Sequence, residues 1–527
     1  MKFPRLGIIG ILLILSTNDV ISSNILGLFL THSPSHVIVH MGVVRALVKR
    51  GHNVTVVTSM RLKDPNFGYR HIYLKTLEHT QNDTFTMMDT VISAPFYLKP
   101  YKFFLVGKEM IEKYSSYNLD PDYISFKKEN NHFDLVLLGY QYNELNLGEA
   151  AHFKCPSVLV WMMQPFGHIS RLIGNPNLPA FVPYSPFIPP NAMDFTHRVL
   201  NYIFYVVEGI ITKIFEHVLK IYYDQIYPSP EYPSYWKTKK NISLIFYNHH
   251  FSEAPVRPLV PGLIEIGGIQ IKEKPDPLPK DLQDYLDNSS QGVIYFSLGS
   301  NACGLHVKEH TYKMIFEVLS SLKYNVIWKL DEIKHPGNAS NILYKSWLPQ
   351  DDILPHKNVK LFITHAGKGG VTEAEYHEVP MVALPIMDDQ PSNARNMQAK
   401  GHGLVLDHTT MTKETFREAI NEVLKNKTYK NNVQTFSRLY KDRPMTAKQT
   451  AVYWIEYVIR HRGAPHMQSP LKDLNVLQEN SVDVILFLLL MLYISFKLGK
   501  MLIKYCFNKL VRRFGFPKDI KSDHKKE

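Results

Sequence analysis

Cysteine is scarce in this chain, and the shortage limits how the fold can be stabilised. The sequence has three cysteines among 527 residues, namely Cys155, Cys303 and Cys506. Small disulfide-held folds need a far higher density of cysteine, so the chain must rely on hydrophobic cores. Its length provides material for more than one core. The sequence allows at most one disulfide in the folded body, and we expect none.

Basic residues outnumber acidic residues, and much of the excess lies near the C-terminus. The chain has 60 Lys and Arg against 48 Asp and Glu, a formal net charge of +12. Residues 497–527 alone hold ten Lys or Arg and three Asp or Glu. A nucleic-acid-binding protein would spread positive charge over its folded body, so we expect no nucleic-acid partner. Internal repeats and low-complexity tracts are also missing from the sequence, which argues against a repeat architecture.

Both ends of the chain carry apolar segments. Residues 1–23 combine Lys2 and Arg5 with an apolar run and small residues, the pattern of a secretory signal peptide. Val482–Phe496 is almost entirely apolar, which predicts a transmembrane helix over residues 481–503. The basic residues that follow predict a cytosolic tail at 504–527 and a body in the lumen. Six N-x-Ser/Thr sequons are consistent with a luminal glycoprotein.

Between these ends, strand and helix patterns alternate. The predicted strands are Ile25–Leu30, Val54–Thr58, Phe133–Leu138, Ser157–Met162, Val293–Leu298 and Val326–Lys329. Helices are predicted near Val37–Lys49 and Lys308–Leu322. This alternation indicates parallel, doubly wound sheets. We therefore expect α/β domains at 24–265 and 292–445, joined by a charged, proline-containing linker at 266–291.

Residues 347–390 form the most informative segment, WLPQDDILPHKNVKLFITHAGKGGVTEAEYHEVPMVALPIMDDQ. His365-Ala-Gly-Lys-Gly-Gly370 is a glycine-rich turn between a strand, Lys360–Thr364, and a helix. Free backbone N–H groups and the helix dipole at such a turn favour a phosphate. Glu373, expected in the first turn of that helix, can accept hydrogen bonds from two ribose hydroxyls.

The flanks of this turn suit the other parts of a nucleotide sugar. Trp347 is a flat ring that can stack on a base. A second buried strand, Met381–Leu384, leads to Asp389 and Gln390, which can exchange hydrogen bonds with a sugar. Contacts for base, phosphate, ribose and hexose therefore follow one another in a single strand–helix–strand run.

This order of motifs resembles the signature of the UDP-glycosyltransferases, the superfamily of animal UDP-glucuronosyltransferases and insect UDP-glucosyltransferases. The matching pieces are WLPQ, FITHAG, the Glu of TEA, PMVALP and DDQ. The resemblance is insect-like, and it implies two facing Rossmann-like α/β domains, the GT-B arrangement, plus a C-terminal transmembrane helix. It also implies that the segment 446–480 contains a helix returning to the first domain, and that the protein is a single-pass protein of the endoplasmic reticulum membrane.

The resemblance assigns roles for donor binding. It places Trp347 on uracil, Gln350 at the base or ribose, and Glu373 at the ribose hydroxyls. It places Asp389 and Gln390 at the transferred sugar. The diphosphate is assigned to these residues: Ser300, His365, Gly367, Gly369 and Gly370. The family usually has glycine at position 366, where this chain has alanine.

The resemblance assigns the catalytic base to His36, which follows the first strand. An Asp normally orients this histidine, and its position here holds Gly139. Three explanations stay open at this stage. Glu144 substitutes for the missing acid, His36 acts unassisted, or the protein binds UDP-sugars or lipophiles without turning them over.

Together these features predict an inverting enzyme that transfers a hexose from a UDP-sugar to a small lipophilic acceptor. The hexose expected is glucose, and detoxification is the expected role. The alternative is a catalytically impaired UDP-sugar- or lipophile-binding protein on the same fold. The UDP-sugar is a co-substrate, and no cofactor or metal is expected. The spacing of His32, His36 and His40 suggests a zinc site, but no carboxylate or thiol lies nearby in sequence. A helix is expected to begin only after His36, so the three histidines would not share one helix face. A homo-oligomer is left open.

Overall fold

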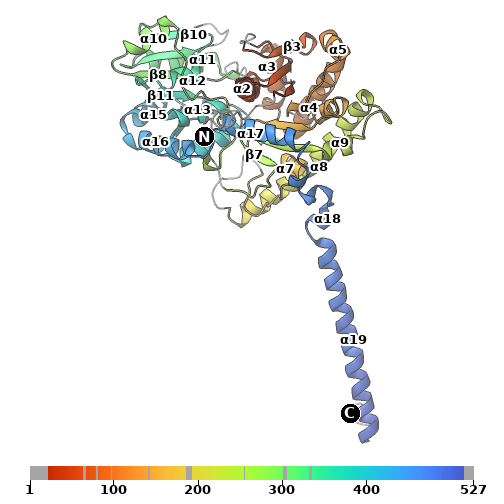
Figure 1. Cartoon of the computed structure of the whole chain (residues 1–527). Coiled ribbons are helices and arrows are strands. Elements are labelled where there is room, and N and C mark those ends of the chain that lie inside the picture. The colour runs from red at the N-terminus through yellow and green to blue at the C-terminus, as the bar shows by residue number, and fades with distance from the viewer. Residues whose placement is uncertain are drawn as a thin grey trace, which may run out of the picture. The chain divides into compact units, whose positions relative to one another are not determined.

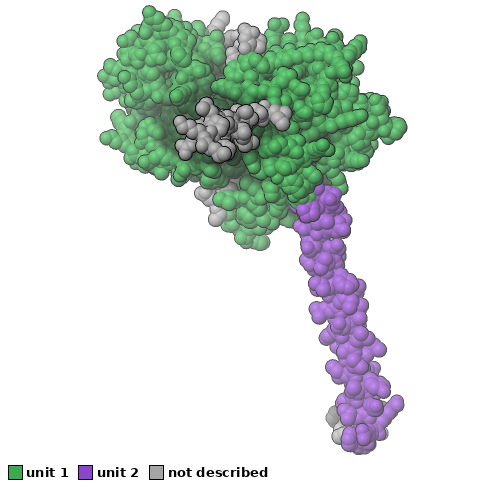
Figure 2. Space-filling view, in the orientation of Figure 1, with its two compact units in different colours: residues 1–469 green, residues 470–527 purple. Residues whose placement is uncertain are grey.

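The computed structural model describes residues 22–62, 67–78, 81–95, 98–140, 143–165, 167–184, 193–253, 256–300, 306–330, 335–387 and 389–515. It divides into two compact units, one ending at Ser469 and the other beginning at Pro470 (Figure 2). The predicted signal peptide, apart from Ser22 and Ser23, lies outside the described residues. The last part of the predicted tail, 516–527, lies outside them as well.

A seven-stranded sheet forms the N-terminal lobe, in the order β3-β2-β1-β4-β5-β6-β7. Its strands are β1 (Asn24–Phe29), β2 (Asn53–Thr58), β3 (Arg70–Tyr73), β4 (Leu135–Gly139), β5 (Ser157–Trp161), β6 (Ile242–Tyr247) and β7 (Leu263–Glu265). All neighbouring strands are parallel. Every residue of the central strands β4 and β5 is buried, because helices cover both faces of the sheet.

The helices of this lobe connect successive strands. They are α2 (Pro34–Arg50), α3 (Gln81–Ile92), α4 (Lys99–Ser115), α5 (Pro121–Lys128), α6 (Gly148–His152), α7 (Gly167–Ile173), α8 (Phe195–Ile226) and α9 (Tyr235–Lys240). Helix α2 begins with Pro34, whose fixed φ suits a first turn, and it ends at Gly51, which adopts a left-handed φ of 101°. Its start before His36 is earlier than the sequence predicted.

A six-stranded parallel sheet forms the C-terminal lobe, in the order β10-β9-β8-β11-β12-β13. Its strands are β8 (Val293–Ser297), β9 (Asn325–Lys329), β10 (Ile342–Lys345), β11 (Val359–Thr364), β12 (Met381–Ala383) and β13 (Gly403–Val405). The helices are α10 (Lys280–Asp287), α11 (Glu309–Ser320), α12 (Gln350–Ile353), α13 (Lys368–Tyr376), α14 (Gln390–Ala399), α15 (Lys413–Lys425) and α16 (Lys427–Lys441). Two further hydrophobic clusters pack against this sheet.

Helix α17 (Ala447–Arg460) follows the C-terminal lobe in sequence but packs on the N-terminal lobe (Figure 1). Its buried residues Ala451 and Ile455 belong to the same hydrophobic cluster as Val43 and Leu47 of α2. Glu456 of α17 also accepts a hydrogen bond from Arg50 at 2.8 Å. The chain therefore crosses between the lobes a second time before its C-terminal unit.

The C-terminal unit contains α18 (Val476–Glu479) and α19 (Val482–Phe514). Helix α19 has 33 residues, a mean hydropathy of 2.1 in its most apolar window, and no buried residue. A helix of this length rises about 50 Å, more than the hydrocarbon core of a bilayer. It fits a single-pass membrane anchor and continues beyond the predicted end at residue 503.

Each sheet reverses its order next to its first strand, and these reversals position the site. In the N-terminal lobe the reversal lies between β1 and β4, and in the C-terminal lobe it lies between β8 and β11. Ligands of doubly wound sheets bind at the carboxyl ends of the strands at such points. His36 follows β1, and His365 follows β11.

Candidate active site

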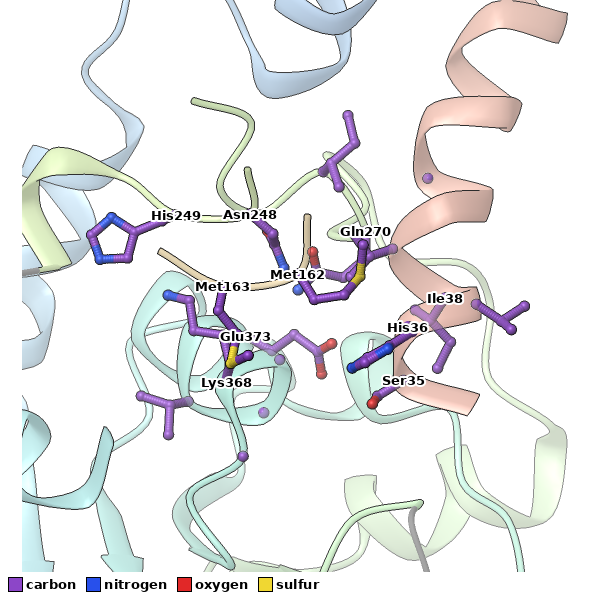
Figure 3. Close-up of a pocket in the computed structure, with 18 of the residues that line it drawn as sticks. Ser35, His36, Ile38, Met162, Met163, Asn248, His249, Gln270, Lys368 and Glu373 are labelled. Carbon is purple, nitrogen blue, oxygen red and sulfur yellow. The ribbon is translucent and has the colours of Figure 1, made fainter. Parts of the chain in front are cut away.

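A cleft of about 2170 Å³ is lined by both lobes of the first unit (Figure 3). Loops that follow strands at the two points of reversal contribute His36 and His365 to its walls. Ten predicted donor residues and His36 line it: Ser300, Trp347, Gln350, His365, Gly367, Gly369, Gly370, Glu373, Asp389 and Gln390. Glu144 does not belong to this set.

The glycine-rich turn passes directly into α13. Gly367 is the N-cap residue of this helix and Lys368 is its first residue. Ala366 adopts a left-handed φ of 62°, held by a 3.2 Å hydrogen bond from its N–H to Thr364 Oγ1. This conformation disfavours an L-residue by about 1–2 kcal/mol, which explains why glycine is expected at position 366. The turn adopts this conformation here with alanine, whose side chain is fully buried.

The ring of His365 packs against Gly299 and Gly367, where a side chain would overlap it. A Cβ at Gly299 would stand 2.5 Å from the His365 ring, and a Cβ at Gly367 would also overlap that ring. Burial, with a contribution from Lys329, lowers the pKa of His365 to about 4. The imidazole is therefore neutral near pH 7 and can donate one hydrogen bond to a phosphate oxygen.

Lys329 is a cation on this wall that sequence reasoning missed. It ends strand β9, and its Nζ donates to the carbonyl oxygen of Gly299 at 2.5 Å. The same ammonium lies 5.1 Å from the centroid of the Trp347 ring, which is 45% exposed. A lysine at the carboxyl end of an otherwise buried strand was the available signal, since such ends line ligand sites.

Glu373 lies in the second turn of α13, one turn later than the sequence suggested. Its Oε2 accepts a 2.7 Å hydrogen bond from Nε2 of Gln350, so the two predicted ribose-side residues touch each other. Burial raises the pKa of Glu373, and the charge of Asp351 adds to the effect. Hydrogen bonds from hydroxyl groups favour the ionised form of a carboxyl group, so ribose hydroxyls would favour the ionised form of Glu373.

Asp389 and Gln390 sit where β12 leads into α14. Asn393 donates to Asp389 Oδ2 at 2.7 Å and to the Ala366 carbonyl at 3.1 Å, which ties this pair to the glycine-rich turn. Burial raises the pKa of Asp389. The carbonyl oxygen of the Gln390 side chain accepts from the backbone N–H groups of Ile386 and Met387. Any hydrogen bond from Gln390 to a sugar must therefore come from its amide N–H groups.

His36 is the third residue of α2 and points into the cleft from the N-terminal lobe (Figure 3). Its Nδ1 lies 3.4 Å from Oγ1 of the buried Thr31. Thr31 Oγ1 also accepts the backbone N–H of Ser33 at 3.1 Å, which fixes the hydroxyl. With Nδ1–H directed at Thr31, the unprotonated nitrogen of His36 would be Nε2.

The position expected for an acid beside His36 is filled by another imidazole. A Cβ at Gly139 would lie 2.5 Å from Cε1 and 2.6 Å from Nε2 of His40. The His40 ring is buried and stacks on Phe29 with centroids 4.5 Å apart. Neither ring nitrogen has a well-aligned hydrogen-bond partner among the described residues. Burial, and then His36, lower the pKa of His40 to about 3, so this ring is neutral.

Glu144, the acid proposed to substitute for the missing one, lies away from the cleft. It lies in the 3₁₀ helix Glu144–Leu147, buried in the N-terminal lobe, where it accepts a 2.8 Å hydrogen bond from the Tyr140 hydroxyl. It also acts electrostatically on Tyr235, a core residue. The explanation in which Glu144 assists His36 therefore gains no support from this geometry, because its carboxyl group lies in the core and not among the residues that line the cleft.

Apolar side chains of the N-terminal lobe line the cleft beyond His36. They are Ile38, Trp161, Met162, Met163, Phe204, Val207 and Ile211. Two of these belong to α2 and β5, and three belong to the long helix α8. A lipophilic molecule that binds here removes its apolar surface from contact with water, which favours its binding.

Comparisons with known proteins agree with this geometry. Residues 27–515 match the family model described as UDP-glucoronosyl and UDP-glucosyl transferase. UDP-glycosyltransferase UGT5 of Dactylopius coccus is 33% identical over 483 residues, covering 89% of this chain and 90% of that protein. UDP-glucosyltransferase 2 of the same organism is 31% identical over 526 residues, covering 98% of each chain.

A human relative and a solved structure extend the comparison. Human UDP-glucuronosyltransferase 1A9 is 34% identical over 388 residues, covering 72% of this chain and 71% of that protein. Among solved structures, the calicheamicin glycosyltransferase CalG4 aligns with a TM-score of 0.52 at 18% identity, covering 84% of this chain and 100% of its own. That structural likeness concerns the fold.

Proposed function

The chain belongs to the UDP-glucuronosyl and UDP-glucosyl transferase family and is a UDP-sugar glycosyltransferase, and we propose that it transfers glucose to a small lipophilic acceptor with inversion. One observation carries this proposal. The cleft joins His36, at the reversal of the first sheet, to the His365 turn, at the reversal of the second. The base and the donor-binding turn therefore face one volume.

The donor would bind on the C-terminal wall. Trp347 offers a ring for uracil, and Gln350 and Glu373 offer hydrogen bonds for base and ribose. The diphosphate would lie at the start of α13, where the backbone N–H groups of Gly369 and Gly370 meet the positive end of the helix dipole. His365, Ser300 and the Lys329 ammonium border the same space. The charge that develops on UDP as it leaves would be stabilised by these groups.

The acceptor would bind on the apolar N-terminal wall with its hydroxyl next to His36. His36 Nε2 takes the hydroxyl proton as the acceptor oxygen forms its bond to sugar C1, and the bond from C1 to the phosphate oxygen breaks. Because attack and departure occur on opposite faces of C1, the configuration inverts. In the tautomer whose Nδ1–H donates to Thr31 Oγ1, His36 Nε2 carries no proton and can accept this one, and the protonated imidazole then returns it to solvent.

Two features support a neutral hexose as the transferred sugar. Asp389 would present a carboxyl group to the sugar hydroxyls, and such a group repels the carboxylate of a glucuronate. One relative that spans 98% of the chain is named a UDP-glucosyltransferase. Relatives named as glucuronosyltransferases are also similar, so a direct comparison of donors decides the point.

We further propose that the body faces the lumen of the endoplasmic reticulum. The apolar helix α19 and the basic residues at and beyond its C-terminal end support this orientation. Protease added to sealed microsomes should remove only the segment after about residue 500, by the topology argued above. Digestion of the body by the added protease would show that the body faces the cytosol and would contradict the proposed orientation.

The decisive experiment measures UDP release from UDP-glucose and UDP-glucuronate with a panel of phenols. UDP binding is measured in parallel by calorimetry. We expect UDP release that depends on the acceptor and is faster with UDP-glucose. UDP binding without transfer to any phenol would exclude phenolic acceptors and weaken the assignment of His36 as a working base.

A further inference from the structure

The wall of the cleft beside Asp389 carries an ion pair that joins the two lobes. Glu253 ends the 3₁₀ helix Phe251–Glu253, which follows β6 of the N-terminal lobe. Its Oε1 lies 2.5 Å from Nζ of Lys368, the first residue of α13, and accepts a 3.0 Å hydrogen bond from the Thr372 hydroxyl. Both charged side chains line the cleft, although Glu253 is only 5% exposed.

Glu253 is held in its charged form. Burial alone would raise the pKa of Glu253, but Lys368 and the backbone N–H of His250 outweigh burial and lower it to about 2. The His250 N–H donates to Oε2 at 2.8 Å. Burial lowers the pKa of His249 to about 3, so this ring adds no positive charge near pH 7.

Lys368 is close to the residues proposed for the transferred sugar. It favours the ionised form of Asp389 both through its ammonium and through its backbone N–H. Lys368 also projects from the same helix as Glu373, and both line the cavity (Figure 3). Without Glu253, Asp389 would remain to oppose the positive charge of Lys368 beside the sugar.

The second ammonium on this wall is balanced as well. Lys400 Nζ donates to the main-chain carbonyl of Glu253 at 2.7 Å. The charges of Glu375 and Glu253 both favour the protonated form of Lys400, against the effect of burial. Lys368 and Lys400 therefore each have a carboxylate near them, which makes both less available to neutralise a sugar carboxylate.

We propose that Glu253 is a specificity-determining residue that makes the enzyme reject uronic-acid donors. It does so by holding the Lys368 ammonium and by adding a second carboxylate to the lining of the cleft that holds Asp389. This inference rests on the proposed transfer of a neutral hexose and names the residue that enforces it. It also implies that the chain carries a latent cation for a sugar carboxylate, covered by a side chain of the opposite lobe.

The test compares UDP-glucose and UDP-glucuronate as donors for the parent and for Glu253→Gln. Glutamine keeps the acceptor oxygen for Thr372 and His250 but removes the charge that holds Lys368. The ratio of kcat/KM for UDP-glucuronate to kcat/KM for UDP-glucose should rise about tenfold to a hundredfold, the size expected for one fixed charge at an effective dielectric constant near 20. Affinity for UDP alone should stay the same.

Three further variants make the result specific. Glu253→Asp keeps the charge and should keep the parent ratio. The double variant Glu253→Gln with Lys368→Gln removes both charges, so the gain in UDP-glucuronate use should disappear. Asp352→Asn breaks a different ion pair, Lys272 Nζ of the segment between the lobes to Asp352 Oδ2 at 2.7 Å, and should leave the ratio unchanged. Thermal unfolding checks that each variant is folded.

The outcomes separate this inference from the proposed function. A parent that prefers UDP-glucose, with an unchanged ratio in folded Glu253→Gln, overturns the inference alone. An equal rise in affinity for UDP and both UDP-sugars also overturns it, because Lys368 would then serve the diphosphate. A parent that prefers UDP-glucuronate overturns the neutral-hexose proposal, and a parent without transfer to any acceptor overturns the proposed reaction.

Discussion

The two lobes bring the same topology to the cleft but hold their functional side chains in different ways. On the C-terminal side, the supporting contacts are short in sequence. Asn393 supports Asp389 four residues away, and Gln350 supports Glu373 from 23 residues away. On the N-terminal side, the residues near His36 come from distant parts of the chain. The ring of His40 packs against Gly139, which lies 99 residues after His40 in the sequence. A site built from one segment can be read as a motif, whereas a site built from distant segments cannot.

This difference has a functional meaning in the proposed mechanism. The nucleotide is the same for every acceptor, so a rigid, locally encoded wall suits it. The acceptor wall combines α2, β5 and α8, and each can vary without disturbing the nucleotide. The following experiments test this division, from the largest expected effect to the smallest.

Replacing the proposed base should have the largest effect. His36→Ala should lower kcat by about 10²–10⁴-fold, the usual contribution of a general base. UDP affinity should stay at the parent value, because His36 belongs to the opposite wall. Steady-state kinetics and calorimetric UDP titration measure the two quantities. A variant that keeps a tenth of the parent rate would show that His36 is not the base, and a large loss of UDP affinity would contradict the division between the walls.

Restoring the missing acid should require two substitutions. Gly139→Asp alone would push its Cβ into the His40 ring, and overpacking of this kind costs about 1–3 kcal/mol of stability. We expect a lower melting temperature and no gain in rate. His40→Ala combined with Gly139→Asp vacates the space, so kcat should exceed that of the His40→Ala variant.

The pH profile distinguishes a working carboxylate from a change in packing. An anion beside His36 favours the imidazolium form, so the rise of kcat/KM with pH should move to higher pH in the double variant. His40→Ala alone supplies the control, because it removes the ring without adding charge. An unchanged pH profile together with a recovered melting temperature would mean that Gly139 serves only packing.

Removing the base-stacking ring should have a moderate effect on the donor wall. Trp347→Ala should weaken UDP binding about tenfold, since stacking on a base contributes about 1–3 kcal/mol. Trp236→Ala is a matched control. That ring is 43% exposed against 45% for Trp347, and lysine ammoniums likewise lie over it. Equal UDP affinity in the parent and in Trp347→Ala would remove the ring from the donor site.

The smallest effect concerns protons. Burial keeps the pKa of Glu373 above its ordinary value in the free protein, and two ribose hydroxyls would favour the ionised form. UDP binding should therefore release a fraction of a proton and strengthen as pH rises toward the raised pKa. Calorimetry in buffers of different ionisation enthalpy measures the release. Glu373→Gln should abolish it, and an equal release by this variant would place the proton elsewhere.

Much of the fold followed from local pattern. The buried strands β1, β4, β8 and β11 were predicted within about two residues, because long apolar runs between turns leave few alternatives. Short strands at or beside the sheet edges, such as β3 (Arg70–Tyr73) and β13 (Gly403–Val405), were not predicted, since their residues lack a clear alternation. The start of α2 was missed because Pro34 was read as part of a loop.

The candidate site divides along the same line. By itself, the sequence determined the family, the motif segment 347–390 proposed to bind the donor and the apolar helix near the C-terminus, since each depends on neighbours within a few turns of chain. Only the tertiary structure decided that His40 fills the space beside Gly139, that Glu144 turns into the core, and that Glu253 holds Lys368 from 115 residues away. These contacts depend on the packing of one lobe against the other and of α2 against β4. Side-chain packing in three dimensions follows the shape of the whole core, which no local pattern of residues encodes.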